Sequence, residues 1–348
     1  MQAKLNQSFE IKLNTLVLAT HGIGDLIMLL PAIKYIDKSN SFMTILLNSK
    51  LEKELFVSAF QDKSIKIYLL SEYQGFFMKF LLLYKLRRVN YDKIIPQASL
   101  SKEKVLILSI FMKSSLLCAF KNYFRKNEKE QFMHKVEVNM SRLVSEIKYK
   151  SVRMRMSYPD LLFSPDAKKL VNNYIDDKVG DNNILIIGPG SYEAEKHKRL
   201  PISYYSPFLK RVFNTFNNIT VLIVGSKDEE GIANEIIDDS SSIHGSIHSV
   251  AGLFSLMESI YLISKSKVVV ANCNAVSHFS ALVGVPVVGL YGPTNYKFTG
   301  PFLTDLYPVS AKTNCSPCYH KKSSGCGNPI CMSEIKPSDI FHQVSKCL

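Results

Sequence analysis

Short apolar runs alternate with helix-like segments along most of the chain, and this alternation limits the possible folds more than any other feature. The apolar runs are bounded by turn residues, as buried strands are, while the segments between them repeat apolar side chains at helical spacing. Strands that alternate with helices pair in parallel. We expect strands at 15–20, 42–48, 64–70, 91–97, 114–120, 183–190, 219–226, 267–272 and 285–292, and helices at 25–38, 76–89, 101–113, 133–147, 202–216, 254–266 and 275–284, with a further helix that begins in the acidic segment 227–237.

The alternation is interrupted between residues 150 and 182, and this interruption divides the chain into two halves of similar style. A length of 348 residues suffices for about two domains. We therefore predict an α/β protein with two doubly wound, Rossmann-like domains, residues 1–165 and 166–348, that face each other across a cleft. Such sheets bind ligands at the carboxyl ends of their strands, so the loops there are the candidate sites.

The charge balance favours an anionic partner. The chain has 43 Lys and Arg against 30 Asp and Glu, a formal net charge of +13. Nucleic acid, an acidic membrane surface and phosphorylated substrates all fit this balance. No helix-turn-helix or basic sheet with interleaved aromatics is visible, so we expect no nucleic-acid partner.

The sequence predicts a cytoplasmic protein that contacts the inner face of the membrane. The N-terminus lacks the pattern of a signal peptide, and the longest apolar run, 105–112, is too short to span a bilayer. The segment "FFMKFLLLYKLRR" (76–88) is aromatic, aliphatic and basic within four turns. It either packs entirely on the first sheet or exposes part of its apolar face to the bilayer interface.

The stretch "HGIGDLIMLLPAI" (21–33) follows the first expected strand and holds the first candidate site. Gly22 and Gly24 let the backbone turn tightly or approach a ligand. Asp25 begins the expected helix. Its carboxylate either caps that helix or faces a cleft and accepts a proton.

Two further strand ends carry charged side chains. Gly188 ends one expected strand, and Lys198 lies in the basic cluster that follows. Lys198 either binds a phosphate as a point charge or belongs to a solvated loop. Ser226 ends the next strand, and Asp228 and Glu229 follow it. These carboxylates either bind ribose hydroxyls or occupy a first helical turn favoured by the helix dipole.

Residues 268–294 place a strand, a tight loop, a short helix and a second strand in succession. The loop and helix start present backbone N–H groups at the edge of the sheet, where they form an anion site suited to a diphosphate. The loop after the second strand returns to the same edge. In isolation, the helical histidine is better explained as a core residue. The candidates here are Asn272, Cys273, Asn274, Ala275, His278, Gly292 and Thr294.

Together these stretches resemble the heptosyltransferase family, bacterial glycosyltransferases that build the inner core of lipopolysaccharide. The resemblance runs from about residue 14 to about residue 342, and is strongest in "VAGLFSLMESIYLISKSKVVVAN" and "SHFSALVGVPVVGLYGPTN". "GIGDLIMLLPAI" matches the family's opening, in which a Gly-Asp pair precedes an apolar helix that contains a proline. "KRLP" at 198–201 matches Lys-(Lys/Arg)-Trp-Pro, with leucine in place of tryptophan.

The resemblance implies a GT-B fold and an inverting, metal-independent transferase that requires no cofactor. The implied donor is a nucleotide sugar, in the first place ADP-heptose, and the implied acceptor is a lipid-linked saccharide. The resemblance assigns the base to Asp25 and the phosphate-binding lysine to Lys198. It places the diphosphate loop at residues 272–278 and the ribose carboxylate at Asp228 or Glu229.

One departure bears on the donor. Cys273-Asn274-Ala275 stands where the family usually has Asp-(Ser/Thr)-Gly, so a carboxylate, a hydroxyl and a glycine are all replaced. Two alternatives follow: a transferase that uses a different nucleotide sugar, or a relative that binds nucleotide or saccharide without catalysis. The retained Asp25 and Lys198 weigh against the second.

A cysteine-rich tail spans residues 315–331. Five of the seven cysteines follow residue 314, and Cys315, Cys318, Cys326 and Cys331 have the spacing of metal ligands. This spacing predicts a structural zinc ion or iron–sulfur cluster. The preferred alternative is a structural tie between the tail and the C-terminal domain.

Overall fold

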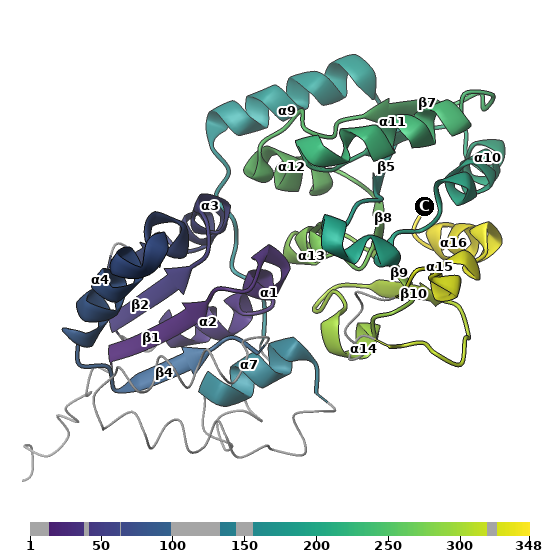
Figure 1. Cartoon of the computed structure of the whole chain (residues 1–348). Coiled ribbons are helices and arrows are strands. Elements are labelled where there is room, and N and C mark those ends of the chain that lie inside the picture. Colours follow the sequence, from purple (N-terminus) through teal and green to yellow (C-terminus); the bar gives the residue numbers. More distant parts are fainter. Residues whose placement is uncertain (1–13, 38–41, 63, 99–132, 144–155, 319–325) are drawn as a thin grey trace, which may run out of the picture. The chain divides into compact units, whose positions relative to one another are not determined.

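The computed structural model describes residues 14–37, 42–62, 64–98, 133–143, 156–318 and 326–348. Contacts between Cα atoms divide the chain into two compact units, each built around its own parallel sheet (Figure 1). Unit 1 comprises Met1–Lys53, Phe60–Gln131 and Val136–Arg155. Unit 2 comprises Glu54–Ala59, Phe132–Lys135 and Met156–Leu348. The cleft and the boundary at residue 165 remain predictions.

The sheet of unit 1 has the strand order β3-β2-β1-β4, and all its strand pairs are parallel. One face is covered by a helix, α4, whose Leu82 and Leu86 pack against Leu16, Leu18 and Leu46 of the strands. The strands are β1 (Asn14–Ala19), β2 (Phe42–Leu47), β3 (Lys66–Leu69) and β4 (Lys93–Pro96). Its helices are α1 (Ile23–Ile27), α2 (Leu30–Asp37), α4 (Gly75–Arg87) and α7 (Lys135–Leu143), of whose residues only Lys135 belongs to unit 2. The division between the two units falls within α3 (Lys50–Ala59).

The sheet of unit 2 has the order β10-β9-β8-β5-β6-β7, again all parallel. Its strands are β5 (Asn183–Gly188), β6 (Ile219–Ile223), β7 (Ser246–Ser249), β8 (Val268–Asn272), β9 (Val287–Tyr291) and β10 (Leu306–Ser310). Its helices are α9 (Pro165–Lys178), α10 (Tyr205–Thr215), α11 (Glu230–Asp239), α12 (Leu256–Ile263), α13 (Ala275–Leu282), α14 (Tyr296–Thr299), α15 (Ile330–Ser333) and α16 (Pro337–Val344).

The core of unit 2 explains the apolar runs in the sequence. Alternate strand residues such as Leu185, Val221 and Val270 pack against α10, α11, α15 and α16. The neighbouring residues Ile186, Leu222 and Val269 point to the opposite face and are equally buried. A parallel sheet with both faces covered needs continuous apolar strands. The predicted α/β class with two doubly wound sheets is therefore confirmed.

Several elements differ from the predictions. The helix expected at 25–38 is two helices, α1 and α2, because Pro31 lacks the N–H that would continue the first one. The edge strands β7 and β10 were not predicted, since β7 is polar and β10 contains Pro308, which only an edge position tolerates. The helices α3, α9, α14, α15 and α16 were not predicted either. The helix expected at 101–113 and the strand expected at 114–120 lie outside the described residues.

Both sheets contain a switch point where the chain crosses from one side of a strand to the other. In unit 1, β2 and β3 lie on one side of β1, and β4 lies on the other. In unit 2, β6 and β7 lie on one side of β5, and β8 lies on the other. Ligands bind such sheets in the crevice that the switch point opens at the carboxyl ends of the strands. The loops after β1, β4, β5 and β8 therefore define where a ligand is expected.

Candidate functional site

The switch point of unit 1 carries Asp25. Gly22 is the N-cap of α1, and Asp25 is the third residue of that helix, in its first turn and half-buried. Asp25 is therefore not the N-cap, which was one of its two predicted roles. The adjoining strand β4 ends beside Gln97, whose side-chain oxygen accepts a hydrogen bond from the His21 backbone N–H at 3.1 Å. The Gln97 side-chain nitrogen is buried without a partner among the described residues, so it can donate to a ligand.

A helix braces this edge of the sheet. Asn139 of α7 is 1% exposed and accepts a hydrogen bond from the Ala98 backbone at 2.8 Å. Its amide nitrogen donates to the Met28 carbonyl, directly after α1, at 3.1 Å. Arg142 donates to the carbonyls of Pro96 and Gln97. These contacts fix the loops after β1 and β4 relative to each other. None of Asn139, Arg142 and Gln97 was predicted from the sequence.

The switch point of unit 2 is held together by two asparagines. Asn272 at the end of β8 is fully buried, donates to the Pro189 carbonyl at 2.6 Å and accepts from the Leu200 N–H at 3.2 Å. Asn274 is the N-cap of α13, and its oxygen accepts from the Ser277 N–H. The Asn274 amide nitrogen donates to the carbonyls of Gly188, at 2.9 Å, and Gly190, at 2.8 Å. The loops after β5 and β8 are thus tied directly to each other.

Gly188 allows α13 to lie close to the sheet. A Cβ atom at Gly188 would lie 2.8 Å from the Val276 side chain in the first turn of that helix. Because glycine has no Cβ, the N-terminus of α13 reaches the end of β5. Cys273 and Ala275 flank Asn274 there and are half-buried, whereas His278 is buried within α13. The predicted diphosphate loop is therefore a real strand–loop–helix junction at the switch point.

Lys198 ends the 3-10 helix η4 (Glu193–Lys198) and is 5% exposed. Its ammonium forms an ion pair with the Glu195 carboxylate at 2.8 Å. The adjacent His197 is buried, and burial together with the Lys198 charge lowers its pKa, so that its ring is neutral at pH 7. Arg199 donates to the Ser191 carbonyl at 2.6 Å and thereby closes the loop that carries Lys198. The sequence identified Lys198 but not its carboxylate partner.

The two predicted ribose carboxylates have different surroundings. Glu229 accepts hydrogen bonds from the backbone N–H and the hydroxyl of Ser226, at 2.7 and 3.1 Å. Its other carboxylate oxygen lies where a side chain at Gly190 would project, so Glu229 reaches the loop after β5. Asp228 is exposed on the 3-10 helix η6 (Lys227–Glu229).

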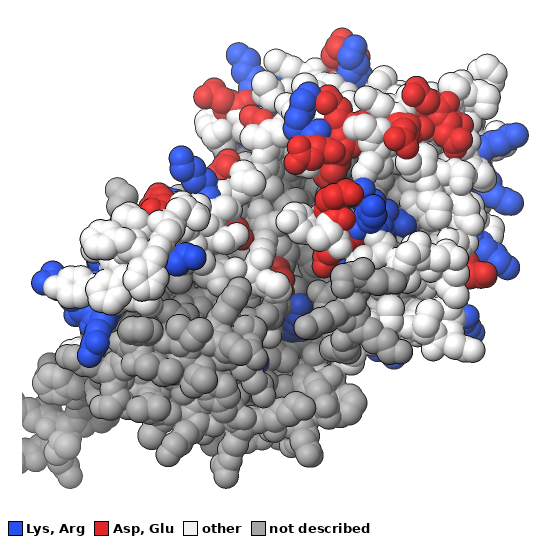
Figure 2. Space-filling model, viewed as in Figure 1, with Lys and Arg blue, Asp and Glu red and all other residues white. Residues whose placement is uncertain are grey.

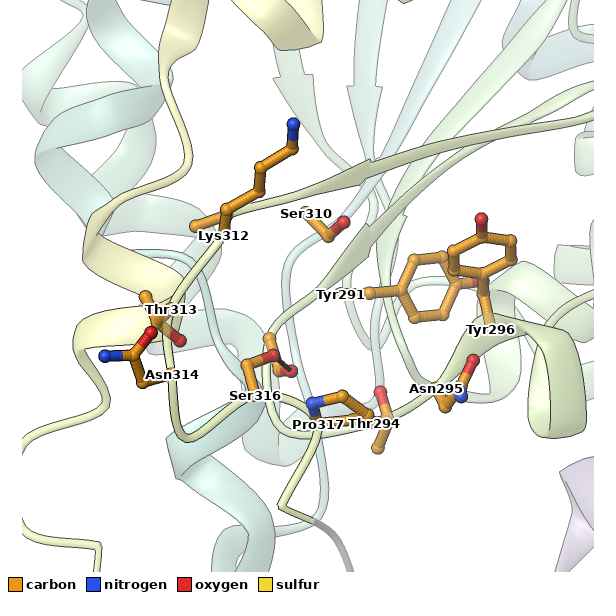
Figure 3. Close-up of a pocket in the computed structure, with 12 residues that line it drawn as sticks. Tyr291, Thr294, Asn295, Tyr296, Ser310, Lys312, Thr313, Asn314, Ser316 and Pro317 are labelled. Carbon is orange, nitrogen blue, oxygen red and sulfur yellow. Dashed lines mark hydrogen bonds between the residues drawn. The ribbon is translucent and has the colours of Figure 1, made fainter.

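Gly292 and Thr294 line a separate cavity of about 380 Å³ at the carboxyl ends of β9 and β10. Figure 3 shows the rings of Tyr291 and Tyr296 on one side of this cavity and Thr313 and Asn314 on the other. The lining combines two aromatic rings with hydroxyl, amide and ammonium groups, which suits a polar ligand with apolar faces. The remaining polar side chains in the lining are Asn295, Ser310, Lys312 and Ser316.

The cysteine tail packs onto the same end of the sheet. Cys331 is 3% exposed in the core of unit 2, and its sulfur would lie 2.8 Å from a Cβ atom at Gly292. The Cys318 backbone N–H donates to the Pro293 carbonyl at 3.0 Å. Cys315 and Cys326 are exposed. Among the residues that the structure describes, no three His, Cys, Asp or Glu side chains are grouped so that they could hold a metal ion.

The described geometry brings most of the predicted donor residues to one edge of unit 2, at the ends of β5, β6 and β8. Asp25 belongs to unit 1 and stands at the equivalent switch point there. Gly292 and Thr294 follow the next strand, β9. Burial raises the pKa of the neighbouring Tyr291, and Cys273 of the diphosphate loop and Tyr296 of the cavity raise it further. Tyr291 therefore lies near both the diphosphate loop and the cavity.

Known proteins resemble this chain in both sequence and fold. Lipopolysaccharide heptosyltransferase 2 of Salmonella typhimurium is 28% identical over 204 residues, which cover 57% of this chain and 56% of that protein. The chain thus spans about half the length of the curated relative that it matches. The solved structure titled E. coli ADP-heptose lps heptosyltransferase II has a TM-score of 0.70 at 18% identity and covers 96% of this chain and 98% of its own.

A more distant fold neighbour is the iron-containing glycosyltransferase TibC from enterotoxigenic E. coli, with a TM-score of 0.59 at 12% identity, covering 97% of this chain and 76% of its own. The sequence pattern of glycosyltransferase family 9 (heptosyltransferase) matches residues 81–326, well over half of the sequence. This match includes Lys198, both asparagines of the unit 2 switch point and the loop after β9. The chain therefore belongs to glycosyltransferase family 9, the heptosyltransferase family.

Proposed function

We propose that this protein transfers heptose from ADP-heptose, with inversion, to a saccharide of the lipopolysaccharide core or a related lipid-linked saccharide. Family membership and the names of the matched relatives support the donor and the acceptor. The observation that carries the proposal is the position of the assigned residues. Asp25 lies at the switch point of one sheet, and the loop of Asn274 lies at the switch point of the other.

Asp25 is proposed as the general base. An acceptor hydroxyl must lose its proton as it attacks the anomeric carbon, and a carboxylate at the end of β1 can accept that proton. Hydrogen bonds hold the backbone on both sides of the helix that carries Asp25, because Gln97 accepts from the His21 N–H before α1 and Asn139 donates to the Met28 carbonyl after it. The side-chain nitrogen of Gln97, which has no partner among the described residues, is a suitable donor to a sugar hydroxyl.

Lys198 and the N-terminus of α13 are proposed to stabilise the diphosphate leaving group. Lys198 supplies a positive charge, and the N-terminus of α13 supplies backbone N–H dipoles, where negative charge develops on the leaving group. This stabilisation requires no metal ion. Glu229, rather than Asp228, is proposed to bind the ribose hydroxyls, because its carboxylate already reaches the loop after β5.

The altered loop is compatible with donor binding. The Asn274 amide already ties the loop to the carbonyls of Gly188 and Gly190, so no carboxylate is needed at Cys273 to hold it. The helix N–H groups that attract phosphate belong to the backbone and survive the substitution. The sugar preference is the property that the replaced side chains can change. A donor other than ADP-heptose is therefore the second candidate.

Two measurements test the proposal. A thermal-shift screen with ADP, UDP, GDP, CMP and their sugars identifies the donor, since a specific ligand stabilises the folded state by mass action. A transfer assay with the selected donor and a heptose-deficient core saccharide then measures turnover. Stabilisation by none of these ligands, together with no transfer, would reject the proposal. Stabilisation without transfer would favour a non-catalytic binder.

Substitution of Asp25 by asparagine tests the base assignment. The Asp25→Asn variant keeps the shape of the side chain but cannot accept the proton, so we expect turnover to fall about 100- to 10,000-fold. Asp92→Asn is the control, because Asp92 accepts a hydrogen bond from the Asn14 N–H at the opposite end of β1 and is expected to be dispensable for transfer. Full turnover by folded Asp25→Asn enzyme would falsify the assignment.

The cysteine tail is proposed to act by packing. Cys331 and Met332 belong to the core of unit 2, and Tyr204 donates to the neighbouring Ser333 carbonyl at 2.7 Å. A structural zinc or iron remains a prediction, and the described cysteines do not by themselves form a site for one. Elemental analysis of the purified protein decides between the two roles: close to one metal ion per chain would contradict the packing proposal.

A further inference from the structure

The helix α4 is apolar on two opposite faces. On one face, Leu82 and Leu86 are buried and Met78 packs beside them in the core of unit 1. A surface helix that buries one stripe normally presents polar side chains on the other. In α4 the other face is aromatic instead. The exposed fractions are 90% for Phe76, 76% for Phe77, 56% for Phe80 and 49% for Tyr84.

These four aromatics form one continuous stripe. Their positions follow the i, i+1, i+4, i+8 spacing that places side chains on one side of a helix. A single exposed apolar side chain is common on protein surfaces, but a contiguous apolar patch marks a contact with another molecule. Burial in the core of unit 1 does not explain the stripe, because that contact uses the opposite face.

The charges on α4 and its C-cap identify the contact. Lys79, Lys85, Arg87 and Arg88 are exposed, and no acidic residue lies between Gly75 and Arg88. Figure 2 shows the surface over α4 as uncharged, with basic side chains along its margins. The Arg88 guanidinium lies 4.9 Å from the centre of the Tyr84 ring, so aromatic and cationic groups share one surface.

We propose that this face of α4 docks onto an anionic lipid bilayer. The phenylalanine rings would lie at the boundary between headgroups and acyl chains, and the basic side chains would contact lipid phosphates. A symmetric dimer through the same patch is disfavoured, because it would bring the cationic residues of two copies together. The +13 formal net charge of the chain favours the same partner. The docking surface does not depend on the transfer reaction.

Co-sedimentation with vesicles tests the docking surface. The probes are vesicles of phosphatidylcholine alone and of phosphatidylcholine mixed with phosphatidylglycerol. We expect the wild-type chain to prefer the mixed vesicles. The double variant Arg87→Glu, Arg88→Glu should bind them at least about tenfold more weakly, since each basic residue near an anionic surface contributes measurably to binding. The triple variant Phe76→Ser, Phe77→Ser, Phe80→Ser should lose binding to both kinds of vesicle.

The matched control is Lys168→Glu with Lys169→Glu. This change alters the net charge equally, on two exposed residues of α9 in unit 2. It should leave vesicle binding within about twofold of wild type if α4 is the docking surface. An equal loss in both charge variants would show a general charge effect and overturn the proposal, as would absence of wild-type binding. A wild-type dimer that the phenylalanine substitutions convert to a monomer would assign the patch to self-association instead. Transfer to a soluble acceptor, measured separately, should be the same in all these variants.

Discussion

At the scale of single residues, the buried ammonium of Lys198 is already paired with Glu195 at 2.8 Å. A diphosphate that binds Lys198 must share it with this carboxylate or displace it. We therefore predict that Glu195→Gln increases the affinity for ADP by about tenfold. This gain corresponds to about 1.4 kcal/mol, the order of one charge-assisted hydrogen bond between Lys198 and the diphosphate for which the Glu195 carboxylate no longer competes. Titration calorimetry of ADP measures the change.

The neighbouring Glu193 provides the control for this substitution. Its carboxylate is exposed and pairs with Arg199 at 3.0 Å rather than with Lys198. Glu193→Gln should leave the ADP affinity nearly unchanged. Weaker ADP binding by Glu195→Gln would mean that the carboxylate positions Lys198 for the ligand, contrary to the competition argument.

Two substitutions distinguish the contribution of Lys198 to ADP binding from that of the altered diphosphate loop. Lys198→Ala removes a buried positive charge, whereas Cys273→Ser exchanges one weak hydrogen-bonding group for a hydroxyl. Because the helix N–H groups are unaffected by either change, Lys198→Ala should weaken ADP binding much more than Cys273→Ser. Calorimetry on both variants measures this difference. Complete loss of ADP binding in Cys273→Ser would show that the side chain itself contacts the phosphates.

From the sequence, the places of the site residues in the fold were easier to predict than their hydrogen-bond and ion-pair partners. Strand ends are visible as the last apolar residues of a run, so the loops of Asp25 and Asn274 could be located. The pairing of Lys198 with Glu195 was not predictable, because it depends on the 3-10 helix η4, which brings residues three apart together and was not expected from the sequence. Gln97 is the last residue of an expected strand, and this position was the one feature of the sequence that could have identified it as a site residue. Asn139 lies in the middle of a helix, where its tie to the Met28 carbonyl has no sequence signature.

At the scale of elements, buried strands were predictable and edge strands were not. β5, β6, β8 and β9 are buried on both faces, so their sequences are apolar except at Asn183, Thr220 and Asn272. The edge strands β7 and β10 have polar or proline-containing sequences, since only one neighbour pairs with them. The start of α9 did carry a signal: Ser164 caps the helix and Pro165 follows at its first position.

The Asn274 side-chain amide ties the start of α13 to the loop after β5. Asn274→Asp retains an oxygen to cap α13 but places a second oxygen against the carbonyls of Gly188 and Gly190. Two hydrogen bonds are lost and two carbonyls are left facing a negative charge. We predict that the free energy of unfolding falls by about 2–3 kcal/mol. Urea unfolding at pH 7 measures the change.

A second asparagine cap serves as the comparison. Asn295 caps α14 by accepting a hydrogen bond from the Lys297 N–H at 3.0 Å. Asn295→Asp keeps that acceptor, so it should cost little. Equal destabilisation by the two substitutions would show that the ties to the glycine carbonyls contribute nothing beyond the helix cap.

At the scale of the whole molecule, the two units share one arrangement of strands. In both, the first strand lies between the strand that follows it in the chain and a later strand, and the candidate residues follow the strands at that switch point. Unit 1 contributes a carboxylate, and unit 2 contributes a lysine and a helix N-terminus. In the proposed reaction, one unit removes the proton and the other stabilises the leaving group.

Global stability is predicted to depend on pH through His134. This residue is buried, its Nε2 bonds the Gly300 carbonyl at 2.9 Å, and its ring stacks on Phe302 with 4.6 Å between ring centres. Burial lowers the pKa of His134 to about 4, with Lys135 acting in the same direction, while the Gly300 hydrogen bond opposes the shift. In the unfolded chain the pKa is about 6.5, so between pH 6.5 and pH 4 the unfolded state binds more protons.

The stabilisation by neutral His134 is therefore complete above pH 6.5 and is lost as the pH falls towards 4. Between pH 7.5 and pH 5 this group should lower the free energy of unfolding by about 2 kcal/mol. Urea unfolding at the two pH values measures the loss. His134→Gln cannot titrate but retains an N–H donor for Gly300, so its own loss between the same pH values should be about 2 kcal/mol smaller. The comparison is made within each protein, so a general destabilisation by the substitution does not affect it. An unchanged pH dependence in His134→Gln would place the acid sensitivity elsewhere, with the buried His197 next to be substituted, since its pKa is lowered in the same direction.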